Sequence, residues 1–152
     1  MNVNKLLFPT DFSSHTDAAF HYAQSLASES RAELYIVHVD DLSDLNPESA
    51  ETNYLYSSAL GGNDRRAVRE RLRSIKPTID GVIYKHRYLR GLAAEEILQF
   101  AAQEKIDLII MASHGRTGFA RLLMGSVAEG VMRKASCPVL VVKQPERAAV
   151  EI

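Results

Sequence analysis

The sequence predicts an α/β fold: an open, doubly wound, parallel sheet of five strands with helices on both faces. Two observations lead to this prediction. Five strand-like segments alternate with segments of helical periodicity, and four of the five are nearly continuous apolar runs. Such runs are typical of parallel strands that helices cover on both sides. We expect residues 1–152 to form one domain, because 152 residues suffice for a two-sided core.

The expected strands are short and end at turn-forming or polar residues. Pro9 would end the first strand, since proline cannot donate to the sheet. The third segment, Val82 to Tyr88, alternates apolar and polar residues, which indicates an exposed face or a place at the sheet edge. The strands are expected at residues 5–8, 33–39, 82–88, 107–112 and 139–142.

Helices are expected at residues 14–28, 64–74, 93–103 and 126–134. Ser13 or Ser14 could cap the first helix, and Tyr22 falls on its apolar stripe. In the last helix, Val127, Val131 and Met132 are expected to point inward. Residues 40–62 are polar and predict a surface loop, and a loop of this length in a compact domain is usually functional or mobile.

The composition excludes several classes of protein. Hydrophobic residues make up 46% of the chain and charged residues 24%, and the net charge is −1, so we expect no general attraction to nucleic acid or anionic membrane. No apolar run approaches the roughly 20 residues that span a bilayer. The N-terminus lacks the apolar region of a signal peptide, which predicts a cytoplasmic protein. Cys137 is the only cysteine, and we expect it to be a small apolar residue at a strand entry.

The segment from Met111 to Ser126 carries the most functional information. It consists of the end of an apolar strand, a loop rich in small residues, and Gly125-Ser126 immediately before a helical pattern. A loop of this kind lets backbone amides approach an anion at a helix N-terminus. We therefore predict phosphate binding, as part of a nucleotide. The P-loop pattern of phosphoryl-transfer enzymes, with its lysine, is absent from the sequence.

An ordered set of segments resembles the universal stress protein family over residues 5–143. The set comprises Pro9-Thr10-Asp11-Phe12-Ser13, Val37-His38-Val39, Gly91 to Leu98, Ser113-His114-Gly115-Arg116-Thr117-Gly118, Gly125-Ser126 and Cys137 to Val142. The resemblance implies a Rossmann-like sheet of strand order 3-2-1-4-5. It also implies a homodimer joined through the strand Val139–Val142, and in many members ATP binding.

The ATP-binding members share a signature of Gly, two residues, Gly, nine residues, Gly, then Ser or Thr. Gly115 takes the second position here, and nine residues separate it from Gly125-Ser126, but Ala112 stands at the first position. If the backbone at Ala112 has a negative φ, the methyl group costs little. If a left-handed conformation is required, alanine costs about 1–2 kcal/mol, or about tenfold in affinity.

The resemblance implies that the cofactor is ATP, with or without Mg²⁺. The residues expected at the nucleotide are Pro9, Thr10, Asp11, Val39, Met111, Ala112, Gly115, Arg116, Gly125, Ser126 and Val127. Four of them have a structural alternative: Pro9 as the residue that ends the first strand, Asp11 as a turn or cap residue, Ser126 as a helix N-cap, and Val39 as ordinary core. No catalytic residue or metal ligand is expected, since the histidines show no metal-binding spacing with one another or with Cys137.

Together with the phosphate-binding pattern, the resemblance implies a homodimeric regulatory protein of the stress response that binds an adenine nucleotide. Two alternatives stay open. One is an enzyme that hydrolyses ATP slowly. The other is a dimeric interaction module that binds no nucleotide, and Ala112 is the residue that favours it. The sequence names no protein partner.

Overall fold

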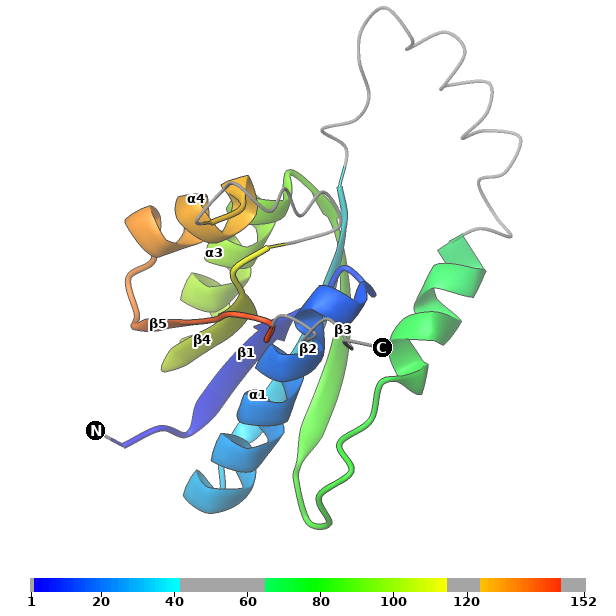
Figure 1. Cartoon of the computed structure of the whole chain (residues 1–152), viewed down its shortest axis with the longest axis vertical. Coiled ribbons are helices and arrows are strands. Elements are labelled where there is room, and N and C mark those ends of the chain that lie inside the picture. Colours follow the sequence, from blue (N-terminus) through cyan, green and yellow to red (C-terminus); the bar gives the residue numbers. More distant parts are fainter. Residues whose placement is uncertain (1, 42–64, 115–123, 146–152) are drawn as a thin grey trace, which may run out of the picture.

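The computed structural model describes residues 2–41, 65–114 and 124–145, and its centre is one parallel sheet (Figure 1). The strand order is β3-β2-β1-β4-β5, which confirms the predicted fold and the order implied by the family resemblance. The strands are β1 (Lys5–Pro9), β2 (Glu33–Asp41), β3 (Tyr84–Gly91), β4 (Leu108–Ala112) and β5 (Val139–Val142). The helices are the 3₁₀ turn η1 (Ser14–Thr16), α1 (Asp17–Ser30), a helix over residues 65–74, α3 (Ala93–Glu104) and α4 (Ser126–Lys134).

Helices cover both faces of this sheet. Successive side chains of a strand point to opposite faces, so each central strand contributes to two cores. Leu6 and Phe8 of β1 pack in a cluster with α1, which we call the α1-side core, and Leu7 packs in a second cluster with α3 and α4, the α3/α4-side core. All three side chains are at most 1% exposed. β1 is therefore the buried centre of the molecule.

The predicted bounds of α4 and β5 are confirmed. β3 is an edge strand, as its alternation of apolar and polar residues predicted. The start of α1 was predicted wrongly. Thr16 is its N-cap, and neither Ser13 nor Ser14 caps it, because η1 intervenes and the Ser13 hydroxyl donates to Asp11 instead. β3 begins and ends later than expected, since its pairing with β2 continues to Asp41 opposite Gly91.

Two side chains that were expected to point inward are exposed. Tyr22 is 56% exposed because α1 lies against the sheet along Ala19, Ala23 and Ala27, and Tyr22 falls to the side of that row. Met132 is 46% exposed because its neighbour Val131, about 100° away around α4, takes the buried position. Both errors come from treating the apolar stripe of a helix as wider than the face that it buries.

Cys137 is half-buried just before β5, and burial raises the pKa of its thiol. Both observations agree with the expected packing role, since a reactive thiol needs a lowered pKa. In the part of the chain that the structure describes, no helix has the length and apolar character needed to cross a membrane.

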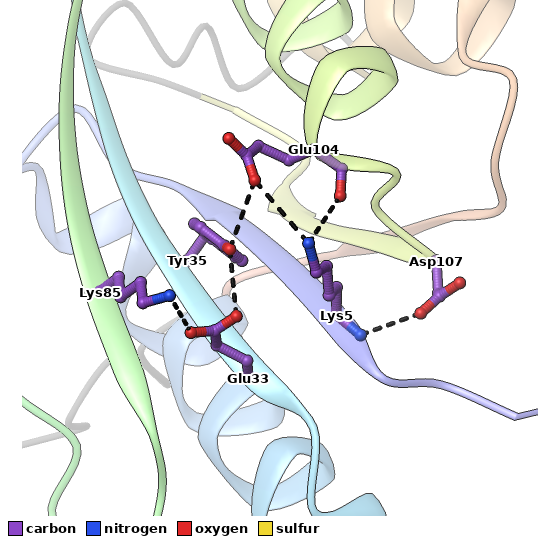
Figure 2. A network of polar contacts seen from close by, with 6 residues as sticks. All are labelled: Lys5, Glu33, Tyr35, Lys85, Glu104 and Asp107. Atoms are coloured by element: carbon purple, nitrogen blue, oxygen red, sulfur yellow. Dashed lines mark hydrogen bonds and ion pairs between the residues drawn. The ribbon is translucent and has the colours of Figure 1, made fainter.

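A polar network joins the amino ends of β1, β2 and β3 (Figure 2). The Tyr35 hydroxyl lies 3.0 Å from Glu33 Oε2 and 3.4 Å from Glu104 Oε2, and Lys85 pairs with the other oxygen of Glu33. The hydrogen bond from Lys85 is the largest cause that holds the pKa of Glu33 below its ordinary value. The amides of Asn4 and Lys5 both donate to Asp107 Oδ2, at 2.8 and 2.9 Å.

We predict that Glu33→Gln makes folding stability less sensitive to acid. The folded-state pKa of Glu33 lies below its ordinary value in the unfolded chain, so its contribution to stability is present above the unfolded pKa and is lost as pH falls through the folded pKa. The urea midpoint should drop less between pH 7 and pH 3 in the variant than in the wild type. Glu29→Gln, on the exposed end of α1, is the control. Equal acid sensitivity of E33Q and the wild type would contradict the assignment.

Candidate functional site

The candidate site lies at the carboxyl ends of β1, β2 and β4 (Figure 1). β1 pairs with β2 on one side and with β4 on the other, so strand order reverses between β1 and β4. Ligands of doubly wound sheets bind in the crevice that this reversal opens. Pro9 ends β1 opposite Val37, and the Thr10 amide continues the ladder with a 2.8 Å bond to the Val37 carbonyl. The expected site residues at these strand ends are thus brought to one edge of the sheet.

Backbone hydrogen bonds tie the start of α4 to the end of β4. The Gly125 amide donates to the Ser113 carbonyl at 2.7 Å, and the Ser113 amide donates to the Val142 carbonyl of β5 at 2.9 Å. The two ends of the segment between strand and helix are therefore held together. Gly115 and Arg116 belong to that segment but lie outside the described residues. His114 is half-buried, and its Nδ1 lies 3.0 Å from Ser113 Oγ.

The N-terminus of α4 lies at this edge of the sheet. Gly125 is the N-cap, with no side-chain capping bond, and the exposed Ser126 is the first helical residue. The alternative in which Ser126 caps the helix is therefore wrong. The first amides of a helix have no partner within it and carry partial positive charge. The Ser126 hydroxyl and these amides form a donor set suited to an anion.

Ala112, the residue that departs from the family's signature, has an ordinary strand conformation. It ends β4 opposite Val142, and the only non-glycine residues with positive φ in the described ranges are Phe12, Arg31 and Lys105. The left-handed penalty considered from the sequence therefore does not apply. Ala112 is 8% exposed and belongs to the α1-side core. Met111, the preceding site residue, belongs to the α3/α4-side core.

Asp11 forms a turn beyond β1. Its Oδ1 accepts hydrogen bonds from the Ser13 amide at 2.9 Å and from the Ser13 hydroxyl at 2.6 Å, which makes the pattern of an Asx turn. The turn role was the structural alternative for this residue, and it is observed. Ligand contact by Asp11 stays a prediction. Thr10 is buried, and its Oγ1 accepts from the Phe12 amide at 3.0 Å.

The remaining hydrophobic site residues contribute to packing. Val39 and Val127 are half-buried against the α3/α4-side core. Val39 is thus core, and the same position leaves it at the end of β2 beside the crevice. Further along β2, the Asp40 carboxylate accepts from the Tyr88 hydroxyl at 2.8 Å, and burial, followed by this bond, raises the pKa of Tyr88 to about 12. This hydrogen bond joins β3 to the carboxyl end of β2.

The sequence did not reveal His38, Phe12 and Arg71 as residues that support the turn at Asp11. His38 is buried, and its Nδ1 lies 2.8 Å from the Thr10 carbonyl. The Phe12 ring stacks on His38, and the Arg71 guanidinium lies over the Phe12 ring. No local pattern reveals Phe12, because its position depends on a positive φ of 68°. Within the described ranges, no group of three or more His, Cys, Asp and Glu side chains could hold a metal ion.

Residues 2–143 match the family model described as "Universal stress protein family". The chain belongs to this family. A similar curated relative is "Universal stress protein MJ0531" of Methanocaldococcus jannaschii, 39% identical over 145 residues that cover 94% of this chain and 84% of the relative. Among solved structures, MJ0577 of the same organism is similar, with 30% identity, a TM-score of 0.80, and coverage of 97% of this chain and all of that chain.

Two more distant solved structures share the fold and were determined with nucleotides. One is a universal stress protein in complex with cAMP, at 22% identity and a TM-score of 0.60 over 94% of this chain and 98% of that one. The other is from Archaeoglobus fulgidus in complex with dAMP, at 21% identity and a TM-score of 0.55 over 94% of this chain and all of that one.

Proposed function

We propose that this universal stress protein binds an adenine nucleotide, with ATP as the first candidate, and acts as a regulatory protein rather than as an enzyme. The observation that carries the proposal is the Gly125–Ser113 hydrogen bond, which holds the N-terminus of α4 against the end of β4. This bond supports the proposal because it keeps the helix amides and the Ser126 hydroxyl near the end of β4, next to the point where strand order reverses. The two solved relatives with cAMP and dAMP support the class of ligand.

In this proposal the phosphates lie at the N-terminus of α4 and at the glycine segment, with or without Mg²⁺. Gly125, Ser126 and the amide of Val127 come from the described part, and Gly115 and Arg116 complete the set. Charge-assisted hydrogen bonds contribute about 1.5–3 kcal/mol each. Three or four of them suffice for micromolar affinity after the cost of ordering is subtracted.

The nucleoside lies toward β1 and β2. Pro9 and Thr10 would contact the base through their backbone, Val39 would pack on the ring, and Asp11 would accept a hydrogen bond from the ribose or base. Met111 and Ala112 would contribute the backbone at the end of β4, since their side chains are buried in the two different cores. Occupancy would change the order of the loops at this edge or the contacts between subunits.

We also propose a homodimer through β5. This strand lies at an edge of the sheet, and its Leu140 side chain is 41% exposed. An exposed apolar edge strand promotes aggregation unless another strand or element covers it. Pairing of β5 with its copy removes that edge and buries Leu140.

We predict that the purified protein binds ATP with micromolar affinity in calorimetry and releases adenine nucleotide when it is denatured. Ser126→Ala should weaken binding by about tenfold or more, because it removes one hydrogen bond to a charged group, worth about 1.5–3 kcal/mol. Ser136→Ala, exposed in the turn before β5, is the matched control. No heat and no retained nucleotide would favour the interaction-module alternative. Many turnovers per minute with Mg²⁺ would favour the enzyme.

We predict that Ala112→Gly changes the ATP dissociation constant by less than about threefold, since a residue with negative φ gains nothing from glycine. The variant should lose about 0.5–1 kcal/mol of unfolding free energy, because glycine in a strand costs backbone entropy. Calorimetry and urea unfolding measure the two effects. A gain of tenfold or more in affinity would mean that the methyl group obstructs the nucleotide.

We predict a dimer in sedimentation at micromolar concentration, with a mass about twice the 16.9 kDa of the chain. Leu140→Lys should shift the protein to monomer, because it places a charge in the middle of the apolar edge. Tyr22→Lys, which introduces the same charge at another exposed hydrophobic residue, on α1, should leave the dimer intact. A wild-type monomer at that concentration, or a dimer that persists in L140K, would overturn the assignment to β5.

A further inference from the structure

A stack of three side chains lies behind the turn of residues 10–13. The Phe12 ring centroid is 4.1 Å from that of His38, with 25° between the ring planes. Arg71 belongs to the helix over residues 65–74, and its guanidinium carbon lies 4.8 Å from the Phe12 ring centroid. This helix contains five arginines and is called the basic helix below. The stack therefore links β2, the turn and the basic helix.

The ends of the stack also hold the backbone of the turn. At one end, His38 Nδ1 lies 2.8 Å from the Thr10 carbonyl, which can only accept, so Nδ1 carries the proton. At the other end, Arg71 Nη2 donates to the Phe12 carbonyl at 3.3 Å. Carbonyls on both sides of Asp11 are thus fixed by side chains from other elements.

The turn needs this support for two reasons. Phe12 has a φ of 68°, a region that residues with a Cβ rarely adopt and that persists only when the surroundings impose it. Behind the turn there is also an open cavity of about 170 Å³, lined by Phe8, Phe12, Phe20, Arg71 and Ile75 among others. Packing is therefore incomplete on this side, so the stack has to fix the position of the turn.

The stack faces away from the proposed base. Phe12 packs against the α1-side core, whereas Val39, which would contact the base, packs against the α3/α4-side core. Alternate residues of β2 point to opposite faces, so His38 and Val39 cannot both face the nucleotide. The three residues of the stack would act through the turn and not by touching the ligand.

We propose that Arg71, Phe12 and His38 are positioning residues, which hold Thr10 and Asp11 in the shape that the nucleoside requires. The inference rests on the proposed nucleotide site. It adds that the basic helix is energetically coupled to that site. By linkage, a nucleotide that favours the ordered turn also favours the docked basic helix, to the same extent.

The test compares two arginines of the basic helix by calorimetry with ATP. Arg71→Ala should weaken binding by about fivefold, as expected for the loss of one stack and one hydrogen bond. Arg73→Ala removes the same charge from an exposed position on the same helix and should leave affinity unchanged. Arg71→Lys keeps the charge but loses the planar group, so it should resemble R71A. Wild-type affinity of R71K, or equal losses in R71A and R73A, would show that charge alone matters.

Two substitutions of Phe12, one of which keeps the aromatic ring, test the stack in the same calorimetric assay. Phe12→Tyr keeps the ring and should bind ATP like the wild type, whereas Phe12→Ala should bind about as weakly as R71A. Urea unfolding of all variants identifies any that fail to fold, and R71K and F12Y keep the comparison informative in that case. Equal affinities of F12Y and F12A would overturn the role of the stack.

Hydrogen exchange tests the coupling between ATP binding and the basic helix directly. A purely structural role of Arg71 would not make exchange in this helix depend on ATP. Saturating ATP should slow amide exchange in residues 65–74 of the wild type and of R73A, and should slow it much less in R71A. Exchange that does not respond to ATP in the wild type would contradict the coupling. A wild type that binds no adenine nucleotide would refute the proposed function itself. A wild type that binds, with R71A binding equally well, would refute only this inference.

Discussion

The position of β1 in the middle of the sheet determines most of what this protein can do. β1 pairs with β2 on one side and with β4 on the other, and its inward side chains are almost completely buried. Because parallel strands need crossovers, the chain covers one face with α1 and the other with α3 and α4. β1 leads to α1 on one face and β4 leads to α4 on the other, and the crevice between the two strand ends is a geometric result of the connectivity. Function depends on which groups line that crevice.

Sequence patterns predicted the architecture well, because parallel strands that are buried on both faces have a distinctive composition. β1, β2, β4, β5 and α4 were all located within two residues of their bounds. Finer features followed rules that a linear pattern does not contain. The Asx turn at Asp11 competes for the Ser13 hydroxyl, so the expected cap of the first helix does not form. The row of alanines in α1 allows close approach to the sheet, which leaves Tyr22 at the side.

The meeting of the strand ends at the candidate site could be predicted for a similar reason. Strand ends and small residues are visible in the sequence, and parallel topology gathers them at one edge. The sequence could not decide the conformation of Ala112, because the same residue fits both a strand and a turn, and only the pairing with Val142 settles it. Nor could it show Phe12, His38 and Arg71 together. They are brought together by β2 pairing and by the docking of the basic helix, which are contacts between distant parts of the chain.

The hydrogen bond from the Ser113 amide to the Val142 carbonyl has a consequence for the whole assembly. The peptide groups that end β4 serve the candidate site on one side and the edge strand on the other. Any strand that added to β5 would stiffen the backbone against which the α4 amides are held. Self-association and retention of a small molecule would then be linked equilibria, and the protein's apparent affinity would rise with its own concentration.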